Sequence, residues 1–167
     1  MREATDAVDG IRDRLTALYP DLDTSAFGVT GRVLRLAQAI DRLRADHLSQ
    51  FGLVPGDFDV LATIRRIEGD TGVNPRRLLQ SVLITSGGLT KRLDRLETAG
   101  WVVRHPDPDD RRGTLVRLTP EGRDLIDHAL PSLLASEQEL IGRTLTDRQR
   151  DQTAASLRRL VLALPDG

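Results

Sequence analysis

The sequence contains no cysteine and few aromatic residues. Without cysteine, the chain can form no disulfide, no cysteine-based zinc site and no thiol redox sensor. Aromatic residues account for 3% of its 167 residues, whereas hydrophobic residues together account for 39%. Leucine, valine, isoleucine and alanine must therefore form most of the core, and the length suits one domain with extensions.

Long apolar runs are also missing. No stretch approaches the roughly 20 residues that a membrane-spanning helix needs. Residues 1–4 (Met-Arg-Glu-Ala) carry mixed charge and are not followed by the apolar segment of a secretory signal. We therefore expect a cytoplasmic protein that does not associate with a membrane.

The net charge of −1 and the pI of about 6.3 do not by themselves indicate a nucleic-acid binder. The distribution of charge is more informative. Residues 75–119 contain nine basic and five acidic side chains, a balance of +4, which leaves −5 for the two flanks together. The basic residues are Arg76, Arg77, Lys91, Arg92, Arg95, Arg104, Arg111, Arg112 and Arg117. A basic centre between acidic arms fits a DNA-binding module attached to another element.

Two amphipathic helices are predicted in the first third of the chain. Apolar residues recur every three or four positions over residues 8–18 and again over residues 29–47, which is the spacing of one helix face. Gly52 ends the second helix. A third helix is predicted over residues 55–68, followed by a glycine-containing turn at residues 69–72.

A helix-turn-helix motif is predicted after that turn. Asn74 followed by Pro75 matches an N-cap and a proline at the first helical position. The second helix is expected over about residues 86–99, capped by Thr85 or Ser86. In DNA-binding proteins, the second helix of such a motif lies in the major groove.

The exposed side of that second helix carries the candidate DNA contacts. Leu89 and Leu93 are expected to face the core, and Thr90, Lys91 and Arg92 then lie on the exposed side. The small residues before them let the helix end approach bases and phosphates closely. A solvated amphipathic helix would show the same periodicity, but the preceding turn and the basic residues that follow favour DNA binding.

Two short strands are predicted at residues 101–105 and 114–118, around a charged loop at residues 106–113. Such a hairpin forms the wing of a winged helix. Arg111 and Arg112 at its tip suit a narrow minor groove, where negative potential is concentrated. Taken alone, the loop also fits an ordinary charged turn, and one of its acids could orient an arginine.

Two further helices are predicted near the C-terminus. Thr119 and Pro120 open a long one, and Thr146 with Gln149 matches the capping box of the last one. The apolar faces of the terminal helices exceed what a compact DNA-binding core can cover. We therefore expect these helices to pair with a second copy of the chain, with packing inside one chain as the alternative.

These elements together predict a mainly α fold. We expect a winged helix-turn-helix with a short β-hairpin wing, flanked by N- and C-terminal dimerisation helices. The N-terminal helices would occupy residues 1–50, the DNA-binding core residues 51–120 and the C-terminal dimerisation helices residues 121–167. A homodimer of this kind matches the two halves of a palindromic operator in double-stranded DNA.

Four motifs in the chain are shared with a known family. They are Gly-Asp-Phe-Asp-Val-Leu-Ala-Thr at residues 56–63, Leu-Thr-Lys-Arg-Leu-Asp-Arg-Leu-Glu at residues 89–97, the loop at residues 107–113 and Leu-Thr-Pro-Glu-Gly at residues 118–122. With them the sequence resembles the MarR family (multiple antibiotic resistance regulators) over nearly its whole length. The resemblance implies a homodimeric winged-helix protein, usually a repressor, whose affinity for DNA falls when a small anionic or phenolic ligand binds.

The resemblance also implies roles for individual residues. Arg112 would be the wing residue in the minor groove, and Asp110 would be its orienting partner. The residues along the major-groove contact would be Thr85, Ser86, Thr90, Lys91 and Arg92.

The N-terminal part of the chain has Tyr-Pro-Asp-Leu-Asp at residues 19–23 and Gly-Arg-Val-Leu-Arg-Leu-Ala at residues 31–37. In these segments it is similar to the urate-responsive PecS-like branch of this family. In that branch a Trp, an Asp and an Arg form the ligand site, and a second Arg links the site to the recognition helix. Asp59 matches the Asp, Arg92 the first Arg and Arg104 the second. The Trp has no match, because Leu15 stands near its place and the only tryptophan is Trp101. The resemblance therefore implies a small aromatic or anionic ligand, with the urate site incomplete.

Other interpretations of the same residues stay open. Asp59 and Arg92 fit a structural ion pair between helices equally well. A winged helix can also serve as a protein-interaction module, although basic residues on its exposed side favour DNA. The sequence shows no nucleophile–His–Asp set and no phosphate-binding glycine loop, and its three histidines lack metal-ligand spacing. We therefore expect neither an enzyme nor a cofactor.

Overall fold

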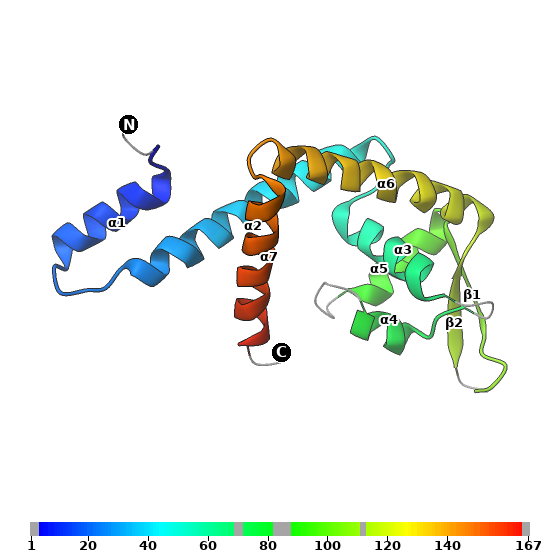
Figure 1. The fold of residues 1–167 in the computed structure, drawn as a ribbon. Coiled ribbons are helices and arrows are strands. Elements are labelled where there is room, and N and C mark those ends of the chain that lie inside the picture. The colour runs from blue at the N-terminus through cyan, green and yellow to red at the C-terminus, as the bar shows by residue number, and fades with distance from the viewer. Residues whose placement is uncertain (1–3, 69–71, 82–87, 111–112, 165–167) are drawn as a thin grey trace. The chain divides into compact units, whose positions relative to one another are not determined.

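A computed structural model describes residues 4–68, 72–81, 88–110 and 113–164 of the chain (Figure 1). The chain divides into two compact units, Met1–Asp46 and His47–Gly167. The first unit holds helix α1 and most of helix α2. The second unit holds the winged helix and the two C-terminal helices.

The first unit is a pair of helices, α1 (Ala7–Leu18) and α2 (Ser25–Ser49), of which the last turn of α2 belongs to the second unit. The side chain of Asp6 caps α1 by accepting hydrogen bonds from two backbone N–H groups. Val8 is buried against the bare Cα of Gly31. Both predicted helices are confirmed, and the small residue on α2 explains how the two helices approach each other closely.

The second unit is the predicted winged helix followed by two helices. Its elements are α3 (Pro55–Ile67), α4 (Pro75–Ser81), α5 (Leu89–Thr98), β1 (Val102–Pro106), β2 (Thr114–Leu118), α6 (Pro120–Gly142) and α7 (Asp147–Leu162). In Figure 1 the helices α3 to α5 and the hairpin lie together beside the first half of α6. The shared core contains aliphatic residues from α3, α5, both strands and α6. The prediction of a mainly α fold with a β-hairpin wing is confirmed.

Local hydrogen bonds fix the helix starts that the sequence predicted. Asn74 Oδ1 accepts the N–H of Arg76 at 2.8 Å, and Thr119 Oγ1 accepts the N–H of Gly122 at 3.0 Å. Thr146 and Gln149 form the expected capping box, because each side chain accepts a backbone N–H of the other residue. These bonds satisfy N–H groups that have no partner within a helix.

The predicted start of the second helix in the motif is wrong. Helix α5 begins at Leu89, and Gly88 is its N-cap, with a φ of 118° and no side-chain cap. A φ of this size is accessible to glycine and costly for other residues, so the glycine sets the helix start in place of a hydroxyl cap. Thr85 and Ser86, the expected caps and DNA contacts, lie outside the described residues.

The wing is an antiparallel hairpin whose register runs from Val102 opposite Leu118 to Pro106 opposite Thr114. Its bounds differ from the prediction by one residue in the first strand. The backbone of Val73 also pairs with that of Val116, with hydrogen bonds of 2.8 and 2.9 Å. The segment before α4 is therefore hydrogen-bonded directly to the wing.

The C-terminal helices leave apolar side chains uncovered. A groove of about 370 Å³ lies between α6 and α7, with Leu134, Ile141 and Leu157 among its lining residues. Further along α7, Leu160 is 51% exposed and Val161 is 65% exposed. In the part of the chain that the structure describes, no helix is both long and apolar enough to span a bilayer.

Candidate nucleic-acid interface

Helix α5 presents two different faces. Leu93 and Leu96 are buried in the core, whereas Thr90 and Lys91 are exposed. Burial of the leucines holds the helix against the domain. The structure thus places Thr90 and Lys91, two of the predicted DNA contacts, on the solvent side of a firmly packed helix.

The prediction that Arg92 lies on the exposed side of the helix is wrong, because its side chain turns toward α3. Its guanidinium lies over the bare Cα of Gly56, where a Cβ would overlap it. Its Nη1 is buried and has no hydrogen-bond partner among the described residues. A buried guanidinium nitrogen without an acceptor is energetically costly.

Arg95, one turn further along α5, has a strong partner that sequence reasoning missed. Its Nε donates to Oδ2 of Asp57 at 2.7 Å, and its Nη2 donates to Oδ1 of the same carboxylate. The hydrogen bond from Arg95 and the charge of Asp57 raise the pKa of the guanidinium above its ordinary value. The carboxylate belongs to the first turn of α3, where a negative charge is favourable.

The signal for this pair was present in the sequence in weak form. Asp57 lies in the first of the four family motifs, and Arg95 lies in the second and among the basic residues of the central segment. The prediction concentrated on Asp59, two residues further along. Asp59 is half-buried on α3, on the same helix as the carboxylate that Arg95 contacts.

Arg104 ties the wing to α5. From strand β1 its Nη2 lies 2.7 Å from Oδ1 of Asp94, and its Nη1 lies 2.8 Å from Oε2 of Glu97. Its backbone N–H also donates to Oε1 of Glu97 at 3.2 Å. We call α5 the recognition helix, because it is the second helix of the helix-turn-helix motif. Two of its acids therefore hold one strand of the wing, so that the helix and the hairpin are positioned together.

Backbone hydrogen bonds join the described residues of the wing loop. The N–H of Asp107 donates to the carbonyl of Gly113 at 3.1 Å, and the N–H of Gly113 donates to the carbonyl of Asp110 at 2.8 Å. A hollow of about 350 Å³ lies between this end of the loop and the first turn of α4. Arg111 and Arg112 lie outside the described residues, so their predicted minor-groove contact and its orientation by Asp110 stay predictions.

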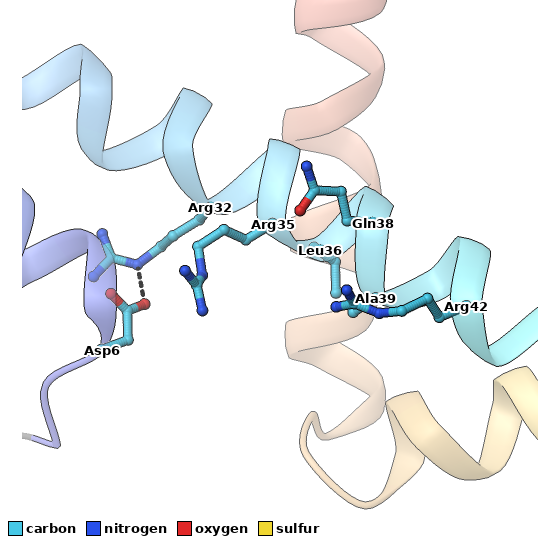
Figure 2. Close-up of a pocket in the computed structure, with 7 residues that line it drawn as sticks. All are labelled: Asp6, Arg32, Arg35, Leu36, Gln38, Ala39 and Arg42. Carbon is cyan, nitrogen blue, oxygen red and sulfur yellow. Dashed lines mark hydrogen bonds and ion pairs between the residues drawn. The ribbon is translucent and has the colours of Figure 1, made fainter.

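A second charged hollow, of about 570 Å³, lies along α2 in the first unit (Figure 2). Arg32 at one end is held by α1, with Nε 2.9 Å from Asp6 and Nη2 2.7 Å from Asp9. Arg35 and Arg42 follow on the same side of the helix, around Leu36 and Ala39. This face is cationic, but none of the sequence-predicted site residues lies on it.

The described residues contain no group of three or more His, Asp or Glu side chains that could hold a metal ion. His47 and His128 make hydrogen-bond contacts. The ring of His47, for example, lies 2.9 Å from the hydroxyl of Ser132 through its Nε2.

Comparison with known proteins points to one family. A family model described as MarR family matches residues 51–113. The chain is 36% identical to the HTH-type transcriptional regulator PecS of Dickeya dadantii over 122 residues, which cover 73% of this chain and 74% of PecS. It is 40% identical to the multiple antibiotic resistance protein MarR of Escherichia coli over 93 residues, which cover 55% of this chain and 62% of MarR.

Solved structures show the same fold. A mutant MarR from E. coli complexed with operator DNA superposes with a TM-score of 0.70 at 29% identity, covering 90% of this chain and 98% of that one. Sco3205, a MarR family transcriptional regulator from Streptomyces coelicolor in complex with DNA, superposes with a TM-score of 0.77. The identity to Sco3205 is 21%, over 87% of this chain and 91% of that one.

Proposed function

The chain belongs to the MarR family of transcriptional regulators, and from this premise we propose that it represses transcription by binding a palindromic operator as a homodimer. The observation that carries the proposal is the exposed polar side of α5, with Thr90 and Lys91 above the buried Leu93 and Leu96. An α-helix with this arrangement fits the major groove of B-DNA.

Contacts in both grooves follow from this placement. The recognition helix would contact bases and phosphates through Thr90 and Lys91, and Thr85 and Ser86, which precede it in the sequence, would add to this contact. The wing would insert Arg111 or Arg112 into the minor groove, with Asp110 as the orienting acid. The link between Arg104 and the two acids of α5 supports this arrangement, because it keeps the wing in register with the helix.

The homodimer is supported by the exposed apolar residues of the C-terminal helices. Leu160 and Val161 on α7 face solvent in a single chain, close to the groove between α6 and α7. A second copy that covered them would remove apolar surface from water. Pairing through these helices also presents two recognition helices to the two half-sites of an operator.

The repressor would be released by a small aromatic or anionic effector. The support is the buried Nη1 of Arg92, which has no acceptor among the described residues. A carboxylate placed there would supply the missing acceptor, and in the ligand site that the resemblance implies it would also repel Asp59. Because Arg92 belongs to α5 and Arg104 is bound to α5, such an anion would shift the recognition helix and the wing together.

Fluorescence anisotropy on the duplex upstream of the protein's own gene tests DNA binding. We expect tight, sequence-preferring binding that weakens steeply with salt, because phosphate contacts release counterions. Lys91→Ala should weaken binding and lower the salt slope by about 1. Arg148→Ala, which removes a charge from α7, is the matched control and should change neither quantity. Binding no tighter than to random duplex would contradict the proposal and favour a protein-interaction module.

Release by effectors is measured in the same assay with urate and a set of aromatic carboxylic acids. We expect at least one aromatic anion to lower DNA affinity. Asp59→Asn and Arg92→Ala should each reduce that response. An unchanged response in both variants would contradict the ligand site and favour a purely structural role for the two residues.

A further inference from the structure

We propose that the ion pair between Asp57 and Arg95 is the joint that sets the orientation of the recognition helix. Asp57 is then a positioning residue for DNA binding, although its side chain is only 6% exposed and lies inside the domain. This inference rests on the proposed DNA-binding function and adds a determinant that lies behind the helix rather than on its DNA-facing side.

The geometry of the pair favours this role. Both oxygens of the Asp57 carboxylate accept hydrogen bonds from the Arg95 guanidinium, one from Nε at 2.7 Å and one from Nη2. Such a bidentate pair fixes an angle as well as a distance, because both groups are planar. The carboxylate itself is anchored, since it stands in the first turn of α3 in the core.

The remaining contacts of α5 are less able to fix its rotation. Leu93 and Leu96 hold the helix to the core by apolar packing, which is not directional. Arg104 attaches to the helix from strand β1, so its ion pairs link α5 to the wing and not to α3. A bidentate contact to a buried group on α3 therefore supplies the directional link between the helix and the core.

The position of Arg95 connects this joint to the DNA-facing residues. Arg95 follows Lys91 by four residues, so that the two side chains stand one turn apart along the same side of the helix. Any rotation of α5 about this ion pair moves Lys91 and Thr90 relative to the major groove of the bound DNA. Asp57 would thus control DNA affinity without touching DNA.

Arg95 is 55% exposed, so a direct contact with a phosphate is the competing explanation. The two roles differ in their salt dependence. A lost phosphate contact lowers the slope of log affinity against log salt by about 1, because one fewer counterion is released. A misoriented helix lowers affinity through Asp57 as well as through Arg95, and removing both partners costs no more than removing one.

The test measures operator affinity at several salt concentrations for wild type, Asp57→Asn, Arg95→Met, Arg95→Lys and the double variant Asp57→Asn/Arg95→Met. We expect each single change to weaken binding about tenfold or more. The double variant should bind the operator as tightly as the single variant that binds more weakly. Arg95→Lys keeps the charge but loses the bidentate geometry, so it should also weaken binding. Lys91→Met, a charge removal on the same helix, should instead lower the salt slope.

Amide hydrogen exchange of α5 in the free protein completes the test and does not depend on DNA. We expect faster exchange in Arg95→Met and Asp57→Asn but not in Lys91→Met. If the wild-type protein bound the operator no more tightly than random duplex, the proposed function would be contradicted. If exchange in α5 were the same in Arg95→Met and Asp57→Asn as in wild type, the proposed role of the ion pair would be overturned. The joint is also overturned if Arg95→Lys binds like wild type while Asp57→Asn loses no affinity, because Arg95 then acts as a phosphate contact.

Discussion

The carbonyl oxygen of Trp101 lies where a Cβ on Gly122 would project, so the start of α6 can pack against the wing only because residue 122 has no side chain. Thr119 completes the junction. Its N–H donates to the Trp101 carbonyl at 3.1 Å, and its Oγ1 donates to the carbonyl of Gly100 at 2.7 Å. The Leu-Thr-Pro-Glu-Gly motif therefore fixes the angle between the hairpin and the long helix.

Gly122→Ala should lower the free energy of unfolding by about 1–3 kcal/mol, because the new methyl group overlaps a backbone carbonyl that cannot move away cheaply. Urea denaturation followed by circular dichroism measures the change. Gly142→Ala is the control in the same helix, since a Cβ there meets nothing within 4 Å. It should leave stability unchanged or raise it by up to about 1 kcal/mol. Equal effects in the two variants would contradict the close packing.

Two arginines one turn apart on α5 should respond to the same substitution with opposite signs. Arg92→Met removes a buried Nη1 that has no acceptor among the described residues, so it should raise the free energy of unfolding by roughly 1 kcal/mol. Arg95→Met removes the partner of the buried Asp57 carboxylate and should lower the free energy of unfolding. Thermal and urea unfolding of both variants, without DNA or ligand, measure the signs. A loss of stability in Arg92→Met would mean that its guanidinium is satisfied.

The sequence predicted the fold closely because the residues that cap its helices act on close neighbours in the sequence. Asn74, Thr119 and Thr146 each cap a helix through a bond to a residue two or three positions away, which a pattern can show. The start of α5 was missed because a glycine conformation decides it, where a hydroxyl cap was expected.

The joint of the recognition helix could not be predicted in the same way. Asp57 and Arg95 are 38 positions apart, and the chain has 24 basic and 25 acidic residues that could pair. Only the packing of α5 on α3 selects this combination. The predicted partners Asp59, Arg92 and Arg104 were chosen by resemblance, and packing places Arg92 over Gly56 and Arg104 on the acids of α5.

Acid should loosen the contact between α1 and α2. The hydrogen bond from the Asp6 backbone N–H, and next the one from Arg32, hold the pKa of Asp9 below its ordinary value. The stabilisation is therefore complete above the ordinary pKa of about 3.9 and is lost as pH falls through the lower folded pKa. The protection factors of the α1 amides, which are the intrinsic exchange rates at each pH divided by the observed rates, should fall between pH 6 and pH 3. Asp9→Asn should weaken this dependence, whereas Asp13→Asn on the same helix should retain it.

A charge placed in the exposed apolar face of α7 should break the proposed homodimer. Leu160→Glu would put a carboxylate where a second copy is expected to pack, and burying that charge unpaired is strongly unfavourable. Sedimentation velocity should show a monomer, and operator affinity should fall because one half-site is then bound alone. Ala155→Glu adds the same charge on another side of α7, about 140° around the helix axis from Leu160, and should remain a dimer. If Leu160→Glu also stayed dimeric, α7 would lie outside the interface, and the apolar groove between α6 and α7 would need another partner.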